Sequence, residues 1–133
     1  MITLVVDTHA ILWYFKGSPE LTAYARQMID TAITSRNQIA IASITLVEIV
    51  YLTEKRRINP AALDHLLATL DDPSKGLTLV PLDRAVSLAL RLISRDLVPD
   101  MPDRIITATA LCMNLPVVSA DRKIQASGIP FIW

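Results

Sequence analysis

The segment ITLVVD, residues 2–7, decides the fold expected for this chain. Residues 2–6 are apolar or β-branched without polar alternation, which predicts a β-strand buried on both faces. Strands of this kind belong to parallel sheets that are covered by helices on both sides. A carboxylate, Asp7, follows the strand directly. Open parallel α/β sheets bind their ligands just beyond the carboxyl ends of their strands. Asp7 is therefore a candidate functional residue.

Short apolar runs of the same kind recur along the chain and alternate with helical patterns. We predict further strands at 39–42 (IAIA), 77–80 (LTLV), 116–119 (PVVS) and 130–133 (PFIW). Helices are predicted over 8–16, 18–35, 44–56, 60–71, 84–95, 102–114 and 121–126. Strands that alternate with helices imply crossover connections. The expected fold is a three-layer α/β/α arrangement with a mostly parallel central sheet, formed by residues 1–133 as a single domain.

Composition limits the possible partners and the location. Thirteen basic and thirteen acidic residues give zero formal charge, which argues against a general attraction to nucleic acid but allows a local basic patch. The only cysteine, Cys112, excludes an internal disulfide and suits a reducing compartment.

The chain is 52% hydrophobic, but its longest apolar stretch, 39–52, is interrupted by Glu48 and is too short to cross a bilayer. No signal peptide is recognisable at the N-terminus. We expect a cytoplasmic protein with no membrane partner. The excess apolar surface predicts a homodimer or a protein partner.

Four acidic residues stand at or near the starts of predicted helices: Asp7, Glu48, Asp103 and Asp121. Each has an ordinary structural explanation. Asp7 suits a helix N-cap, Glu48 suits a capping box with Thr45, and the other two suit the positive end of a helix dipole. For any one of these acids taken alone, the structural role is the favoured explanation.

The four acids together favour a metal site. They are followed by apolar helical patterns, where unpaired carboxylates are costly, and no lysine or arginine lies in 2–6 or 39–52 to neutralise them. Carboxylates that converge repel each other unless a cation binds. An oxygen-only site suits Mg²⁺ or Mn²⁺, and such a site favours phosphodiester hydrolysis.

Other catalytic arrangements lack support. Neither His9 nor His65 has a partner at metal-ligand spacing, and neither a glycine-rich phosphate loop nor a G-x-S-x-G turn occurs.

Four motifs that follow one another along the chain resemble those of one protein family. VVDTHAILWYF, SITLVEIV, DMPDRIITATAL and LPVVSAD are similar to the motifs of PIN domains, and especially of the VapC type, the ribonuclease toxins of toxin–antitoxin pairs. The closing GIPFIW fits as well, so the resemblance spans the whole chain. It implies a ribonuclease with a Mg²⁺ or Mn²⁺ site, an RNA substrate and a cognate antitoxin protein.

The resemblance also implies roles for individual residues. The family's four acids fall on Asp7, Glu48, Asp103 and Asp121, as catalytic residues and metal ligands. Supporting positions fall on Ser119, which is expected to hydrogen-bond near the metal, and on Asp100. In DMPDR the proline is displaced by one residue to Pro102, which puts the placement of Asp100 in question. Ser43 is expected to cap the helix that carries Glu48.

Cations and aromatic side chains near the acids are candidates for RNA contact. Arg104 and Arg122 are favoured because each neighbours a proposed ligand. Trp13, Tyr14 and Phe15 can stack on bases, although three aromatic residues in a helix belong more often to a core or an interface.

Three alternative functions stay open. A PIN-type RNA-processing nuclease without an antitoxin would carry the same acids. A receiver-like Mg²⁺-binding signalling module would need a phospho-accepting aspartate directly after the third strand, where Asp83 is displaced. A purely binding PIN module would not need all four acids.

Overall fold

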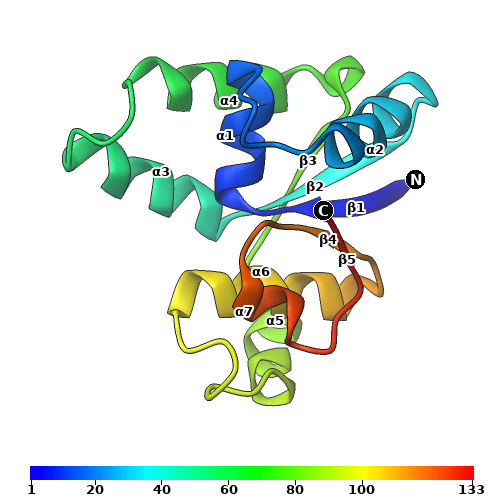
Figure 1. Cartoon of the computed structure of the whole chain (residues 1–133), viewed down its shortest axis with the longest axis vertical. Helices are drawn as coiled ribbons and strands as arrows, with labels where there is room; N and C mark the ends of the chain where they lie inside the picture. Colours follow the sequence, from blue (N-terminus) through cyan, green and yellow to red (C-terminus); the bar gives the residue numbers. More distant parts are fainter.

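A five-stranded, fully parallel sheet organises the protein, and the computed structural model describes residues 1–133. Its strand order is β3-β2-β1-β4-β5 (Figure 1). The strands are β1 (Ile2–Val6), β2 (Gln38–Ala42), β3 (Leu77–Val80), β4 (Val117–Val118) and β5 (Phe131–Ile132). The predicted parallel α/β sheet is confirmed, with all five strands in the predicted segments.

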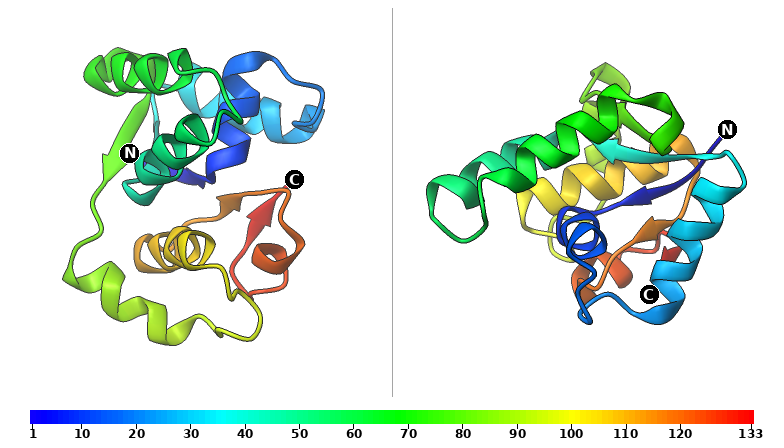
Figure 2. Two further views of the ribbon diagram at one scale, coloured as in Figure 1. Left: turned by 90° about the vertical axis from the view of Figure 1, so that its left-hand side faces the viewer. Right: turned by 90° about the horizontal axis from the view of Figure 1, so that it is seen from above.

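Helices cover both faces of the sheet (Figures 1 and 2). One layer holds α1 (Thr8–Lys16), α2 (Ala23–Thr34), α3 (Ile44–Glu54) and α4 (Ala61–Asp71). The other holds α5 (Arg84–Ala89), α6 (Met101–Met113) and α7 (Arg122–Gln125). Two short 3₁₀ turns, η1 (Pro73–Lys75) and η2 (Leu90–Leu92), complete the elements. The three-layer arrangement follows the prediction.

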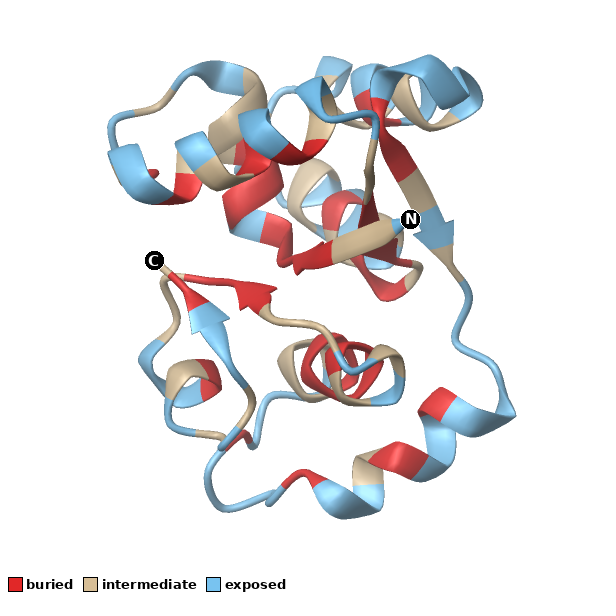
Figure 3. Ribbon diagram, turned by 90° about the vertical axis from the view of Figure 1, so that its right-hand side faces the viewer, coloured by how far each residue is buried: buried red, intermediate tan, exposed pale blue.

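The sheet separates two apolar cores. Leu4 and Val6 of β1 pack with the helices of the first layer, whereas Val5 packs with those of the second layer. Val5 and Val6 are fully buried, as expected of a central strand without polar alternation. Figure 3 shows buried residues in the strands and on the helix faces turned toward them. Burying each such side chain contributes about 1.5–3 kcal/mol.

The order of the strands creates a crevice at the end of β1. After β1 the chain builds the sheet outward through β2 and β3, then returns to the opposite side of β1 to form β4 and β5. The helices that follow β1 and β4 therefore leave on opposite faces of the sheet (Figure 1). Such a switch point opens a ligand site beyond the strand ends. The first residue past β1 at this point is Asp7, whose backbone N–H still bonds to the carbonyl oxygen of Val118 at 3.1 Å.

Two predicted helix boundaries were wrong. The helix predicted from Ser18 begins at Ala23, because Thr22 is its N-cap and its hydroxyl accepts a hydrogen bond from the N–H of Ala25 at 3.1 Å. The Ser18 hydroxyl caps only a local turn, by accepting from the N–H of Glu20. The helix predicted over 84–95 ends at Ala89 and continues as η2. Its predicted N-cap, Asp83, does accept from the N–H of Val86.

Membrane insertion through a helix finds no support in the structure. No helix combines the length and the apolar character that crossing a bilayer requires.

Candidate active site

An acidic cavity of about 350 Å³ lies at the switch point of the sheet. It gathers side chains from the ends of β1 and β4 and from α1, α3 and α6. The sequence expected Asp7, Glu48, Asp103 and Asp121 to converge, and the structure brings all four to this cavity. Its full lining is Asp7, Thr8, His9, Trp13, Glu48, Asp100, Asp103, Ala120 and Asp121.

Asp7 is held rigidly between β1 and α1. Its Oδ1 accepts a hydrogen bond from the N–H of Ala10 at 2.9 Å, so it is also the N-cap of α1. Only 6% of the residue is exposed. Burial raises the pKa of its carboxyl above the ordinary value, while a hydrogen bond with Ser119 opposes that rise. Asp7 thus serves as the N-cap that the sequence predicted and also lies in the acidic cavity.

Glu48 is oriented by a chain of hydroxyl groups rather than by a capping box. The Thr8 hydroxyl donates to Glu48 Oε1 at 2.6 Å and lies 3.0 Å from the Thr45 hydroxyl. Because Thr8 has a single hydroxyl proton, Thr45 is the donor in the second bond. Thr45 is fully buried, so the chain Thr45–Thr8–Glu48 ties α3 to the start of α1.

The expected contribution of Ser43 is wrong. Ser43 stands at the N-cap position of α3, but its side chain makes no cap hydrogen bond, and its own backbone is helical. Its hydroxyl instead accepts from the N–H of Leu82 at 3.0 Å, across the connection that follows β3. Ser43 therefore fixes a loop and does not orient Glu48.

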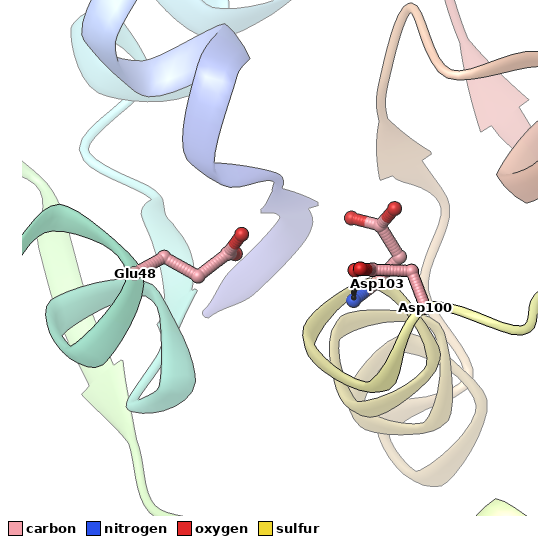
Figure 4. A group of neighbouring side chains, drawn as sticks. All are labelled: Glu48, Asp100 and Asp103. Carbon is pink, nitrogen blue, oxygen red and sulfur yellow. Dashed lines mark hydrogen bonds between the residues drawn. The ribbon is translucent and has the colours of Figure 1, made fainter. Parts of the chain in front are cut away.

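Asp100, whose placement the sequence left in question, lies in the acidic cavity with the other acids. It is the N-cap of α6, and its Oδ2 accepts from the N–H of Asp103 at 3.2 Å. Carboxylate oxygens of Glu48, Asp100 and Asp103 all lie within 4.8 Å of one another. Figure 4 shows Glu48 reaching from α3 toward the two aspartates on α6. The displaced Pro102 occupies the first turn of α6, where its missing N–H costs nothing, so Asp100 keeps its place.

Ser119 and Asp121 complete the cavity beyond β4. Asp121 is the N-cap of α7, where its Oδ1 accepts from the N–H groups of Lys123 and Ile124. The fully buried Ser119 hydroxyl accepts from the N–H of Asp121 at 3.0 Å. The Ser119 side chain also lowers the pKa of the neighbouring Asp7 carboxyl. The expected role of Ser119 near a metal stays a prediction.

The cavity accumulates negative charge without a basic partner. Burial, followed by repulsion from Asp100 and then Asp121, raises the pKa of Asp103 to about 7. Burial also raises the pKa of Glu48. No lysine or arginine lines the cavity. A clustered oxygen-only donor set of this charge fits a divalent ion such as Mg²⁺ or Mn²⁺.

Two residues of the cavity were missed by the sequence reasoning. Thr8 appeared only as part of an apolar helix, although its position directly after Asp7 already placed it at the strand end. His9 was considered only as a metal ligand, for which it lacks a partner in the sequence. It is exposed, lines the cavity, and stacks on Trp13 with ring centroids 5.8 Å apart.

The two arginines proposed for RNA contact differ in the structure. Arg104 donates from Nε to the carbonyl oxygen of Ile93 at 3.0 Å and from Nη2 to that of Leu90 at 2.8 Å. Its guanidinium thus fastens the segment after α5 onto α6, and its expected RNA contact is not supported. Arg122 is exposed at the start of α7, next to Asp121. Its role in RNA contact stays a prediction.

Replacing Thr8 by valine tests the hydroxyl chain. Thr8→Val keeps the side-chain shape but leaves the Glu48 carboxylate without its donor. We expect the free energy of unfolding to fall by about 1–2 kcal/mol and catalytic activity to fall about tenfold or more, the usual scale for losing a group that orients a metal ligand. Urea unfolding and a nuclease assay measure the two effects. Thr8→Ser retains the donor and should retain both properties; a serine variant as impaired as the valine variant would contradict this role.

Replacing Arg104 by methionine tests its structural role. Arg104→Met retains the apolar stem and removes two hydrogen bonds from a charged donor, so unfolding should become easier by about 1.5–3 kcal/mol. Arg122→Met is the matched control and should leave the urea midpoint within about 0.5 kcal/mol of the parent, as is usual for exposed surface positions. Equal stability of the two variants would show that the Arg104 contacts contribute nothing.

The fold and the cavity together define a class of protein: a parallel α/β domain covered by helices on both faces, with a cluster of carboxylates at its switch point. The sequence model of the PIN domain matches residues 4–128. The chain therefore belongs to the PIN domain family.

Individual relatives resemble the chain over nearly its whole length. Ribonuclease VapC22 of Mycobacterium tuberculosis (strain ATCC 25618 / H37Rv) is 26% identical over 130 residues, which cover 98% of this chain and 95% of the relative. Among solved structures, VapBC2 from Rickettsia felis bound to a DNA fragment from its promoter superposes with a TM-score of 0.71 at 17% identity, covering 98% of this chain and 97% of that chain. A toxin–antitoxin complex from Klebsiella pneumoniae gives 0.65 at 22% identity, with 96% and 93% covered. These two structures support the fold.

Proposed function

We propose that this PIN domain is a metal-dependent endoribonuclease and the toxin of a toxin–antitoxin pair. The observation that carries the proposal is the meeting of five carboxylates in one cavity whose lining contains no lysine or arginine. The full-length similarity to a ribonuclease supports RNA as the substrate.

The cavity fits Mg²⁺ or Mn²⁺ held by Asp7, Glu48, Asp103 and Asp121, with Asp100 as a fifth carboxylate. When bound, such an ion lowers the pKa of water and offsets the charge of a phosphate. We add Asp100, for which the sequence indicated only a supporting position, to the proposed ligands because one of its carboxylate oxygens lies in the same cluster as those of Glu48 and Asp103.

The chain's own residues supply order around this site. Thr8 fixes one oxygen of Glu48, which leaves the other free to face α6. The N–H groups that bond to Asp7 and Asp121 hold both carboxyl groups on short, stiff turns. These hydrogen bonds hold the carboxyl groups in one orientation. Such preorganised groups can position a phosphodiester and the attacking water for in-line displacement.

A protein partner is supported by similarity to a toxin–antitoxin complex and by exposed apolar side chains. Val47, Tyr51 and Met101 are 47, 58 and 60% exposed beside the acidic cavity. We propose that an antitoxin and a second copy of the chain cover such surfaces. The RNA-processing alternative differs only in lacking the antitoxin. The receiver alternative is not favoured, because β3 is an edge strand and Asp83 serves as the N-cap of α5.

Mapping RNA ends during expression tests the proposed function. Cells expressing the chain should accumulate RNA with new 5′ ends at recurring sites, and purified protein should produce the same ends with Mg²⁺ or Mn²⁺ but not with a chelator. Cells expressing Asp7→Asn provide the control. Identical 5′ ends from the parent and this variant would show that the cavity is not the source of cleavage.

A further inference from the structure

A second cavity, of about 700 Å³, adjoins the acidic cavity. It lies between α1, the end of α3 and the start of α4, and we refer to it as the α1–α4 cavity. His9 and Trp13 line both cavities, so their two side chains form a shared wall. A strand-like ligand bound in the acidic cavity would therefore extend along this wall into the α1–α4 cavity.

Aromatic rings supply flat surfaces in the α1–α4 cavity. The His9 and Trp13 rings are stacked with 23° between their planes. The Phe15 and His65 rings also line the cavity and meet edge to face with centroids 4.4 Å apart. Nucleobases stack on such rings with little dependence on sequence.

The charge of the α1–α4 cavity is opposite to that of its neighbour. Lys16 and Arg57 line it, and no carboxylate does. Both cations are exposed. A polyanion whose phosphate lies in the acidic cavity would therefore find two positively charged side chains in the adjoining cavity, which favours binding of a phosphate backbone.

Asn59 adds a polar group suited to a base edge. Its side-chain oxygen accepts from the N–H of Ala61 at 2.9 Å, which leaves the NH₂ group as the available donor. An NH₂ donor at the wall of an aromatic cavity can bond to a carbonyl oxygen or ring nitrogen of a base.

We propose that the α1–α4 cavity binds one nucleotide of the RNA substrate, adjacent to the phosphate that is cleaved. The inference rests on the proposed ribonuclease function and adds where the neighbouring base is held. The base stacks against the shared wall of His9 and Trp13 and near His65, and Arg57 contacts its phosphate. Charge complementarity and continuity with the acidic cavity favour this occupant over an antitoxin peptide or a second copy of the chain.

Titration with mononucleotides tests the inference without requiring catalysis. The protein contains two tryptophans, Trp13 and Trp133, so Trp133→Phe leaves Trp13 as the only tryptophan reporter. In EDTA, UMP and AMP should quench its fluorescence with a Kd of about 1–10 mM, as expected for one stacked base with one phosphate contact. Ribose 5-phosphate, which lacks the base, should bind about tenfold more weakly.

Variants in the same background identify the cavity. Arg57→Gln and His65→Ala should each weaken UMP binding about 5- to 20-fold, through loss of a phosphate contact or of a stacking surface. Arg56→Gln is the matched control, since Arg56 is an exposed neighbour that does not line the cavity, and it should bind like the parent. Circular dichroism verifies that the variants are folded.

The possible outcomes separate this inference from the proposed function. Nucleotide binding that depends on Arg57 and His65 supports the inference even where no RNA is cleaved, a result that would remove the nuclease assignment alone. Flat titrations of the parent overturn the inference, as does equal binding by all variants. Flat titrations combined with Arg57-dependent antitoxin-peptide binding or self-association would assign the cavity to a protein partner instead.

Discussion

Asp7→Asn is expected to lower ribonuclease activity by about 1,000-fold or more, the scale on which a catalytic unit responds to loss of one member. Asn keeps the size of the side chain and is an equally good N-cap, so α1 should begin as before. What disappears is one buried negative charge from the acidic cavity. The variant should therefore unfold at the same urea concentration as the parent or at a slightly higher one.

Asp83→Asn provides a matched control for this experiment. Asp7 and Asp83 are both N-caps whose Oδ1 accepts a backbone hydrogen bond at 2.9 Å from the residue three positions on. Only Asp7 lies in the acidic cavity. Cleavage of a labelled RNA by the Asp83 variant should match the parent. Comparable losses in both variants would mean that activity reports helix capping and not the carboxylate cluster.

Most of the fold could be predicted because its determinants are local in the sequence. Apolar runs without alternation identified the strands, and their alternation with helices left few topologies other than a covered parallel sheet. The start of α2 could not be predicted in this way. Ser18-Pro19 has the composition of a helix start, but the buried Leu21 and the Thr22 cap move the start five residues along.

The candidate site was predictable for residues that end strands and less so for those placed by tertiary contacts. Asp7 follows β1 directly and Asp121 stands three residues past the end of β4, so the sheet places both. Thr8 acts on Glu48, 40 residues away, and only packing of α1 against α3 makes that contact. Arg104 adjoins a proposed ligand in sequence, but the helix turns its side chain toward the carbonyl groups of Leu90 and Ile93.

The stability of the ion-free protein should fall as the pH rises from about 4 to about 7. The pKa of Asp103 is raised from the model-peptide value of 3.8 to about 7, and the pKa values of Asp7 and Glu48 are raised as well. At a pH between the pKa of a carboxyl in the unfolded state and its pKa in the folded state, the folded state binds more protons than the unfolded state. Raising the pH through this window removes those protons at a cost to the folded state, and above pH 7 the penalty from Asp103 is complete.

Thermal unfolding in EDTA measures this dependence. The Asp103 shift corresponds to about 2 kcal/mol once its partial solvent exposure is discounted, which lowers Tm by about 6–10 °C between pH 4.5 and pH 8. Asp103→Asn cannot ionise at this position and should flatten much of the profile, with a higher Tm than the parent at pH 8. Asp83→Asn again serves as the control, because its charge lies outside the cavity.

Divalent ions should act in the opposite direction. In the proposed site Mg²⁺ or Mn²⁺ would bind the ionised carboxylates of the folded state, so its stabilising effect should grow as the pH rises from 5 to 8 and should be largest where the ion-free protein is least stable. At about 100 times the Kd the ion contributes about 2.7 kcal/mol, enough to offset the Asp103 penalty. Asp103→Asn should lose most of this response. An ion-independent Tm at pH 8, or a Tm in EDTA that rises from pH 4.5 to pH 8, would mean that the carboxylates are not held together in the folded protein, and the metal site would lose its physical basis.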